Sequence, residues 1–406
     1  MNVLLLHDSF PAQYRHIAAR LAADPKNKVV FGSRPGEGAM PGVIRGICEP
    51  TREINPAMHP YCHPFEAAVL NGQAVFRLCD QLRRDGFVPD VICGHSGWGN
   101  TFYVAEAFPD TPILSYFEWY YHPRGSDSDF LDPSSIDEEA GCRIRSRNAP
   151  ILMDLAQCAW GVCPTQFQLS QFPKPFQSKI SLLHDGVDTA FFQPAPGRDL
   201  VLPTLNLSGV SEIVTYGTRG MEPYRGFPQF MEAAALLLER RPSLHIVVFG
   251  ADRIAYGPRL PPGQSFKQKM LEDLPNLDLD RIHFTGLLSY PDYLRVLQAS
   301  SAHVYLTVPF VLSWSLLEAM AAGCLIIASD TEPVREVVNH GENGLLVDFF
   351  APDQLADVVG KALDRPQKHR PLREAARRTI LERYDLASLL PQHIRLIEEV
   401  AAGKRG

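Results

Sequence analysis

Short apolar runs alternate with longer segments of helical periodicity along this chain. Residues 2–6 form the first apolar run, and residues 13–21 place apolar side chains at helical spacing. Parallel strands that are buried on both faces give continuous apolar runs, and the helices that connect them give amphipathic segments. The alternation therefore predicts an α/β protein with parallel sheets, whose ligands bind beyond the carboxyl ends of the strands.

The alternation falls into two series, which are separated by a stretch of different composition and weaker periodicity. Residues 193–210 contain three prolines and two glycines with little periodicity, which is typical of a linker. The first series predicts further strands at residues 29–31, 91–93, 112–116, 161–164 and 178–183, and helices at 65–84 and 154–160. The second series predicts strands at residues 213–216, 245–249, 282–284, 303–306 and 325–328, and helices at 229–240, 293–299, 316–322, 352–363 and 371–401. We therefore expect two Rossmann-like domains facing a cleft, at residues 1–195 and 205–385, and a last helix at 386–406 that returns to the first domain.

Composition and charge exclude several classes of protein. The 406 residues are 45% apolar and 21% charged, which suits a globular protein of two domains and not a disordered or collagen-like one. A formal net charge of −7 gives no overall basic field, so we expect no nucleic-acid partner. No apolar run reaches the roughly 18 residues of a membrane helix, and the start MNVLLLHDSFPAQ resembles a strand more than a signal peptide. Eight scattered cysteines without a CxxC pair then indicate reduced thiols in the cytoplasm.

The strongest functional signal is the segment WSLLEAMAAGCLIIASD, which begins at Trp314. A predicted strand (HVYL) leads through the loop TVPFVLS into this helix, and a glycine turn leads on to another strand. The backbone N–H groups of Leu312, Ser313 and Trp314 would then lie at a helix N-terminus, where phosphate binds readily. Glu318 falls within the first two turns, where its carboxylate could accept two ribose hydroxyls of a nucleotide. The alternative is that Glu318 only complements the helix dipole.

A second signal is TYGTRGMEPYRGF at residues 215–227, just past a predicted strand. Arg219 and Arg225 lie there among three glycines and a proline. Cationic side chains held on glycine-rich backbone suit a diphosphate on which leaving-group charge develops. The alternative is a pair of solvated surface arginines.

Together these blocks resemble glycosyltransferase family 4, a group of retaining, nucleotide-sugar-dependent enzymes with the GT-B fold. Arg219 and Arg225-Gly226 resemble the family's Gly-Arg…Lys-Gly loop, with arginine in place of lysine, and Glu318 with EAMAAGCLIIASD resembles the second Glu of its E-x7-E block. HDGVD at residues 184–188 is similar to its N-G-V-D turn, and residues 336–347 are similar to its closing strand. The resemblance implies a donor site on the second domain, with the following residues: Arg219, Arg225, Gly226, Phe310, Leu312, Ser313, Trp314 and Glu318.

One position departs from the family pattern. The first Glu of E-x7-E, which contacts the transferred sugar in the family, falls on Phe310. Phenylalanine cannot accept a hydrogen bond, and a buried hydroxyl without a partner costs about 1–3 kcal/mol. This departure predicts a 6-deoxy or otherwise modified donor sugar in preference to plain glucose. The alternative is that Phe310 packs behind the loop as part of the core.

The first domain offers the acceptor side. HDSFP at residues 7–11, GHSGWG at 94–99 and YFEWYY at 116–121 are similar to blocks of a sub-group of the family. His95 and Glu118 both follow predicted strands, and the family often has a histidine near the reacting centre at the position of Glu118. A carboxylate there could accept the proton of the acceptor hydroxyl or stabilise positive charge at the anomeric carbon. The alternatives are an ion pair of Glu118 with Arg124 or a helix cap, and a structural role for His95.

Aromatic residues accompany these two candidates. Phe10, Trp98, Tyr120 and Tyr121 are candidates for the acceptor side, because aromatic rings stack on sugar faces or contact a lipid-linked acceptor. Equally, such rings are what protein cores bury.

No metal or cofactor is expected. His59, Cys62 and His63 lie close together, but prolines 60 and 64 break any helix that would align the histidines. The D-x-D strings at residues 127–129 and 278–280 lie outside the blocks that resemble the family. Arg143, Arg145 and Arg147 could touch an anionic membrane from the cytoplasmic side. The alternative is a solvated face.

The resemblance implies retaining glycosyl transfer from a nucleotide diphosphate sugar to a hydroxyl of a saccharide, lipid-linked or small-molecule acceptor, as in polysaccharide biosynthesis. Arg219 and Arg225 would stabilise the leaving diphosphate. Two alternatives share the fold. One is a nucleotide-sugar epimerase or a phosphorylase, and the other is a non-catalytic nucleotide-sugar binder, which Phe310 would favour.

Overall fold

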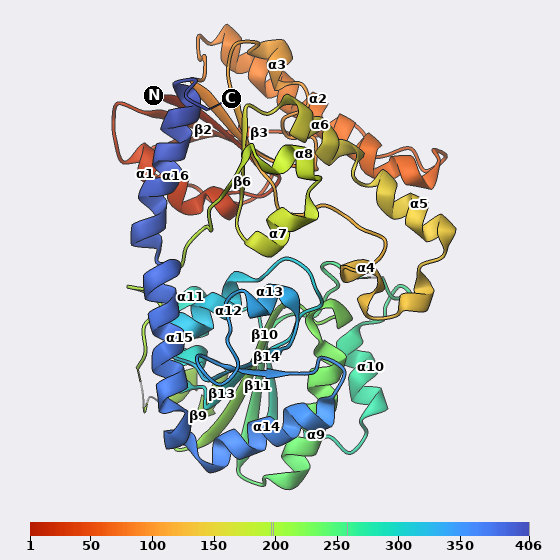
Figure 1. The fold of residues 1–406 in the computed structure, drawn as a ribbon, viewed down its shortest axis with the longest axis vertical. Helices are drawn as coiled ribbons and strands as arrows, with labels where there is room; N and C mark the ends of the chain where they lie inside the picture. The colour runs from red at the N-terminus through yellow and green to blue at the C-terminus, as the bar shows by residue number, and fades with distance from the viewer. Residues whose placement is uncertain (196, 198, 258, 406) are drawn as a thin grey trace. The chain divides into compact units, whose positions relative to one another are not determined.

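The computed structural model describes residues 1–195, 197, 199–257 and 259–405, and the chain divides into two compact units (Figure 1). The first unit comprises residues 1–185 together with the last segment from Ala387, and the second comprises Gly186–Leu386. Across the part of the chain that the structure describes, no helix has the length and apolar character needed to cross a lipid bilayer.

The first unit is built on a seven-stranded parallel sheet with the strand order β3-β2-β1-β4-β5-β6-β7. The strands are β1 (Asn2–Leu6), β2 (Lys28–Ser33), β3 (Val43–Ile47), β4 (Val91–His95), β5 (Ile113–Tyr116), β6 (Trp160–Cys163) and β7 (Ile180–Leu182). The direction of winding reverses between β1 and β4, and in such sheets this switch point forms the ligand crevice. The loops that follow β1 and β4 are therefore the ones placed to build a site.

Helices connect these strands. They are α1 (Arg15–Ala22), α2 (His63–Arg84), α3 (Val104–Ala107), α4 (Asp127–Phe130), α5 (Glu138–Ser146), α6 (Ala149–Gln157), α7 (Gln166–Gln171), α8 (Lys174–Gln177) and α16 (Leu386–Ala401). The helix predicted at residues 154–160 was placed too late, because Pro150 lies in the first turn of α6 and Trp160 already belongs to β6. The last helix, α16, lies beside α1 (Figure 1), and its Leu396 and Val400 share one buried apolar cluster with Ile17 of α1.

The second unit has a six-stranded parallel sheet with the order β12-β11-β10-β13-β14-β15. Its strands are β10 (Glu212–Gly220), β11 (Leu244–Ala251), β12 (Ile282–Gly286), β13 (Ala302–Tyr305), β14 (Ile326–Ser329) and β15 (Leu345–Val347). Its helices are α9 (Phe227–Arg240), α10 (Phe266–Asp273), α11 (Tyr290–Ala299), α12 (Trp314–Ala321), α13 (Glu332–Arg335), α14 (Pro352–Asp364) and α15 (Arg370–Arg383). Here the switch point lies between β10 and β13, so the loops after these two strands flank the crevice.

Two sequence-based boundaries differ from the structure. The division between the units falls at Asp185 and Gly186 rather than within residues 193–210. Residues 196 and 198 of that stretch lie outside the described residues. Its later part forms an antiparallel hairpin of β8 (Leu200–Leu202) and β9 (Leu205–Leu207), from which Leu200, Leu202 and Leu207 are buried in the core of the second unit. The helix predicted at residues 371–401 is interrupted, because Tyr384 and Asp385 pair with Val187 in the manner of a strand.

Candidate donor and acceptor sites

Arg225 connects the two loops at the switch point of the second unit. It ends a short 3-10 turn (Pro223–Arg225) after β10, and its side chain is buried. Its Nη1 atom donates to the hydroxyl of Thr307 at 2.7 Å and to the carbonyl of Val311 at 3.1 Å, both in the loop after β13. These partners are uncharged, so the guanidinium keeps a positive charge that an anionic ligand can neutralise.

Gly226 allows this arrangement. Its φ of +64° lies in the left-handed region, where other residues are strained. A Cβ atom at this position would lie 2.5 Å from the Cβ atom of Leu306, the residue that follows β13. The close approach of the two loops therefore requires glycine after Arg225.

Arg219 lies close to the same turn, near the end of β10, but it is exposed. Its Nη1 atom donates to the hydroxyl of Tyr256 at 3.3 Å. The ring centroid of Tyr256 lies 5.9 Å from the guanidinium carbon of Arg219 and 5.2 Å from that of Arg225. The structure thus places both predicted arginines beside the ring of Tyr256. Two guanidinium groups so close together could bind one diphosphate between them. Their catalytic role stays a prediction.

Glu222 is a site residue that sequence reasoning missed. Its side chain is fully buried, and its carboxylate accepts hydrogen bonds from the backbone N–H groups of Ala255, Tyr256 and Gly257 at 3.1, 3.0 and 2.8 Å. These bonds hold the loop after β11 so that Tyr256 faces the arginines. The available signal was an acidic residue inside a loop that is expected to bind an anion.

The N-terminus of α12 is capped by its own residues. The Oγ atom of Ser313 accepts from the backbone N–H of Ser315 at 3.3 Å, and the backbone N–H of Ser313 donates to the hydroxyl of Tyr305 at 2.9 Å. One of the three backbone donors predicted for phosphate at residues 312–314 is therefore already engaged. The side chain of Leu312 packs in the apolar core, and Trp314 begins the helix.

Glu318 lies in the second turn of α12, as the sequence predicts. The hydroxyl of Tyr293 donates to its Oε2 atom at 2.9 Å. Burial raises the pKa of Tyr293 well above its ordinary value, so this phenol remains a neutral donor. A carboxylate has about four acceptor positions, of which the hydroxyl of Tyr293 uses one.

Phe310 is buried in an aromatic cluster. Its ring lies 5.2 Å from that of Tyr256 and 5.8 Å from that of Tyr224, and the guanidinium of Arg225 lies 5.9 Å away. This packing favours the alternative in which Phe310 supports the loop. The preference for a 6-deoxy sugar stays a prediction.

A cavity of about 260 Å³ occupies the switch point of the first unit. The loops after β1 and β4 contribute Asp8 and the segment from His95 to Trp98. Of the residues predicted for catalysis or the acceptor, four line this cavity: His95, Trp98, Glu118 and Tyr121. The structure adds three charged lining residues that were not predicted for the acceptor: Asp8, Arg34 and Arg147.

His95 is buried at the base of this group. Its Nδ1 atom lies 2.8 Å from the carbonyl oxygen of Ser96, so Nδ1 carries the ring proton. Burial lowers its pKa to about 4, and its ring is stacked on that of Trp98 with the centroids 4.0 Å apart. The neutral ring therefore presents the unprotonated Nε2 atom toward Oε2 of Glu118, 3.8 Å away.

Glu118 is held by polar residues and not by Arg124. Its Oε1 atom accepts from Nε2 of Gln13 at 3.3 Å, and its backbone carbonyl accepts from Nε2 of Gln168 at 2.8 Å. Arg124 donates to the carbonyl of Ile136 instead, and no ion pair joins it to Glu118 within the described residues. This outcome removes one structural alternative for Glu118.

Phe10 and Tyr120, which are also predicted for the acceptor side, do not line the 260 Å³ cavity. The Phe10 ring packs edge-on against Phe31 with the centroids 4.9 Å apart. The Tyr120 ring lies 5.9 Å from that of Phe172. Their role in binding an acceptor stays a prediction.

In the structure, residues of the segments that were considered and rejected as metal sites form other contacts. The backbone N–H of Tyr61 donates to Nδ1 of His59, and Asp129 accepts from the backbone N–H groups of Gly125 and Ser126 at the start of α4. Asp278 forms an ion pair with Arg281 at 2.8 Å. Over residues 1–195, 197, 199–257 and 259–405, no group of three or more His, Cys, Asp or Glu side chains is placed to hold a metal ion.

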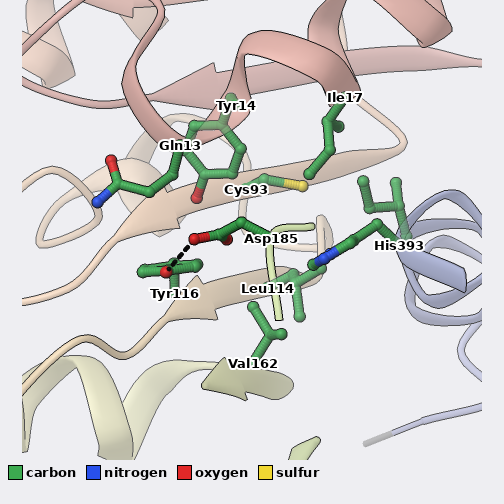
Figure 2. A pocket seen from close by; sticks show the side chains of 10 residues that line it. Gln13, Tyr14, Ile17, Cys93, Leu114, Tyr116, Val162, Asp185 and His393 are labelled. Atoms are coloured by element: carbon green, nitrogen blue, oxygen red, sulfur yellow. Dashed lines mark hydrogen bonds between the residues drawn. The ribbon is translucent and has the colours of Figure 1, made fainter. Parts of the chain in front are cut away.

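A second cavity of the first unit holds about 10 Å³ and lies between α1, β5 and α16 (Figure 2). The buried hydroxyl of Tyr14 points into it toward Asp185, and Asp185 accepts from the hydroxyl of Tyr116 at 3.0 Å (Figure 2). This volume suits about one water molecule and excludes a sugar. The larger cavity is therefore the candidate acceptor site.

Comparison with known proteins supports this division of the chain. The family described as Glycosyl transferase family 4 group matches residues 25–192, and the family described as Glycosyl transferases group 1 matches residues 211–379. An MMP alpha-(1->4)-mannosyltransferase from Mycolicibacterium hassiacum is 27% identical over 259 residues, covering 63% of this chain and 56% of the relative. An alpha-maltose-1-phosphate synthase from Mycolicibacterium smegmatis is 25% identical over 242 residues, covering 58% of this chain and 60% of the relative. The chain thus spans less than two thirds of the length of these curated relatives.

Solved structures share the fold over nearly the whole chain. Sucrose-phosphate synthase from Thermosynechococcus elongatus has a TM-score of 0.72 and 18% identity, covering 99% of this chain and 100% of that chain. HepE from Anabaena, in complex with UDP-glucose, has a TM-score of 0.67 and 15% identity, covering 98% of this chain and 100% of that chain. Because the family matches cover both units and the neighbours share the two parallel α/β sheets, the chain belongs to the glycosyltransferase family 4 group and has the GT-B fold.

Proposed function

We propose that this protein transfers a sugar from a nucleoside diphosphate sugar to an acceptor hydroxyl, with retention of the anomeric configuration. The observation that carries the proposal is the bridge by Arg225 between the loops after β10 and β13, with Arg219 beside it. The match to the family and the complex of HepE with UDP-glucose support a nucleotide-sugar donor. Glu318 would hold the ribose of that donor.

In this mechanism the bond between the anomeric carbon and the diphosphate oxygen breaks first. Arg219 and Arg225 neutralise the negative charge that develops on the diphosphate. The acceptor oxygen forms its bond to the anomeric carbon from the same face, and a diphosphate oxygen takes the acceptor proton. The carboxylate of Glu118 orients the acceptor hydroxyl and stabilises positive charge near the anomeric carbon.

The arrangement needs no metal ion, because two guanidinium groups supply the positive charge that a divalent cation would supply on the diphosphate. We place this chemistry in the cytoplasm, on a saccharide, lipid-linked or small-molecule acceptor of the polysaccharide biosynthesis type. Weak contact with the inner face of a membrane through basic residues of α5 belongs to the same proposal.

A panel of nucleotide sugars tests the proposal. Purified protein is incubated with each donor, with and without chelator, and released nucleoside diphosphate and new glycosides are measured by mass spectrometry. Turnover of at least one donor, unchanged by the chelator, is expected. Tight binding of nucleotide sugar without hydrolysis or transfer would identify a non-catalytic binder, and interconversion of two nucleotide sugars would identify an epimerase.

The same panel tests the donor preference. A 6-deoxy or otherwise modified donor is expected to be used better than UDP-glucose, and Phe310→Glu is expected to reduce that discrimination. Phe310→Leu is the control for packing, since it keeps an apolar side chain at this position. Equal discrimination in all three proteins would mean that Phe310 serves the core alone.

A further inference from the structure

Arg147 is an unpaired cation at the rim of the 260 Å³ cavity. It follows α5, and its guanidinium carbon lies 3.9 Å from the ring centroid of Tyr121. No carboxylate of the described residues forms an ion pair with it. A surface arginine of this kind usually has a solvated head group, but this one is stacked on a ring that lines the candidate acceptor site.

The ring beneath Arg147 is fixed in place. Asn148 binds the backbone of Tyr121 in both directions, with its Oδ1 atom accepting from the N–H at 2.9 Å and its Nδ2 atom donating to the carbonyl at 2.8 Å. Tyr121 itself is half-buried. The guanidinium of Arg147 also hydrogen-bonds to the side chain of Tyr121. Arginine has five N–H donors, so the others remain available to a ligand.

The other ionisable residues that line the 260 Å³ cavity either have a partner or are neutral. Arg34 forms an ion pair with Asp8 at 3.0 Å, so the two charges compensate. Burial lowers the pKa of His95 to about 4, so this ring is neutral near pH 7. The side chain of Glu118 accepts a hydrogen bond from Gln13. Arg147 is therefore the cation of the lining that has no carboxylate partner among the described residues.

We propose that Arg147 binds an anionic oxygen group, a phosphate ester or a carboxylate, carried by the sugar acceptor. The planar N–H fork of arginine matches both groups through two parallel hydrogen bonds. In this arrangement Trp98 and Tyr121 cover the sugar ring, Glu118 holds the reacting hydroxyl and Arg147 holds the charged substituent. The inference rests on the proposed function, and it narrows the acceptor to a negatively charged saccharide.

Binding measurements test the inference without turnover. The full chain is titrated by calorimetry with glucose, glucose 6-phosphate and glucuronate, in the wild type and in Arg147→Gln. Arg143→Gln is the matched control, because Arg143 lies on α5, carries the same charge and is exposed outside the cavity lining. We expect at least one of the two anionic sugars to bind roughly tenfold tighter than glucose in the wild type and in Arg143→Gln, and this preference to vanish in Arg147→Gln. Which anion is preferred separates a phosphate from a carboxylate substituent.

Two results would overturn the inference. One is equal affinity of wild type for glucose and both anionic sugars. The other is an equal loss in Arg147→Gln and Arg143→Gln, which would indicate only general attraction of charge. Failure of the proposed function is distinguishable: an Arg147-dependent preference in a protein that transfers no sugar would contradict catalysis and leave the anion site standing.

Discussion

The Nε2 atom of His95 lies 3.8 Å from the Oε2 atom of Glu118, too far for a hydrogen bond. Because Nδ1 of His95 donates to Ser96, both facing atoms are hydrogen-bond acceptors. A ligand hydroxyl that donates a hydrogen bond to either atom is therefore favoured beside this pair. The side chain of Glu118 is 29% exposed and that of His95 is 3% exposed, so Glu118 is the member that an acceptor hydroxyl can reach.

Replacing Glu118 with Gln should lower kcat by roughly 10²–10³-fold, the usual range for loss of one charge that stabilises the transition state. Affinity for the nucleoside diphosphate should stay unchanged, because no donor contact is assigned to Glu118. Steady-state kinetics and calorimetry with UDP measure the two effects. Full activity of the Gln variant would show that Glu118 takes no part in catalysis and has a structural role only.

Replacing Arg219 with Ala should lower turnover by roughly 10²–10³-fold through loss of one charge donor on the leaving diphosphate. Arg219 is exposed, so the free energy of unfolding should change by no more than about 0.5 kcal/mol. Lys269→Ala removes an exposed cation from α10 of the same unit and serves as the control. Near-wild-type turnover of Arg219→Ala would show that the loop after β10 is structural.

Replacing Glu318 with Gln should weaken binding of free UDP by roughly tenfold or more, since hydrogen bonds to a charged group contribute about 1.5–3 kcal/mol. Tyr293→Phe removes the internal partner at 2.9 Å and leaves the carboxylate, so it should weaken binding less. Calorimetry with UDP compares the two variants. The ribose assignment does not survive if Glu318→Gln binds UDP as the wild type does.

Replacing Glu222 with Gln should release the loop that carries Tyr256. A neutral amide cannot accept as strongly from the three backbone N–H groups, and one of its ends is itself a donor. Hydrogen exchange at residues 255–257 should become faster and the Kd for UDP should rise, while exchange in the first unit stays the same. Unchanged exchange at these amides would mean that the loop holds its conformation without the carboxylate.

Stability should fall as the pH drops from about 6.5 toward 4. Burial lowers the pKa of His303 and His95 to about 4, so in this range the unfolded chain binds more protons than the folded one. The stabilisation is therefore fully present above about pH 6.5 and is lost as the pH falls through the depressed values. Burial raises the pKa of Asp8 and Asp154, which acts in the opposite direction, so the test compares variants.

Urea unfolding at about pH 7.5 and about pH 5 measures this effect in the wild type and in His303→Gln. Gln keeps a polar group near the Thr215 hydroxyl, which lies 2.9 Å from Nδ1 of His303. The wild type should lose more free energy of unfolding between the two pH values than the variant loses. An equal loss would assign the acid sensitivity to other groups.

The arrangement of the second unit could be predicted well because its motifs are local. The glycine turn around Arg225 and the loop before Trp314 each follow a strand that the apolar pattern of the sequence predicts. The order of strands in the sheet places the ends of these two strands next to each other. The bond from Arg225 to Val311 could not be predicted, because a backbone carbonyl carries no sequence signal. Glu222 was missed for a related reason, since its partners are backbone N–H groups of a loop far along the chain.

The acceptor side was harder to predict. Trp98 and Tyr121 line the cavity while Phe10 and Tyr120 do not, although all four are aromatic residues near strand ends. The direction of a side chain in an irregular loop depends on backbone angles that composition does not encode. The hairpin at β8 and β9 shows the same limit, because prolines and glycines around its leucines hid an alternating pattern of burial.

Helix α16 has a consequence for the order in which the protein folds during synthesis. Leu396, Ile397 and Val400 belong to the apolar cluster that also contains residues of β1 and α1, yet they are synthesised after the whole of the second unit. Part of the apolar surface of the first unit therefore stays exposed to solvent until α16 has been synthesised. Gly186–Leu386, in contrast, is a continuous segment that can fold as soon as it emerges. The nascent chain thus has its greatest need of chaperone protection in its earliest half.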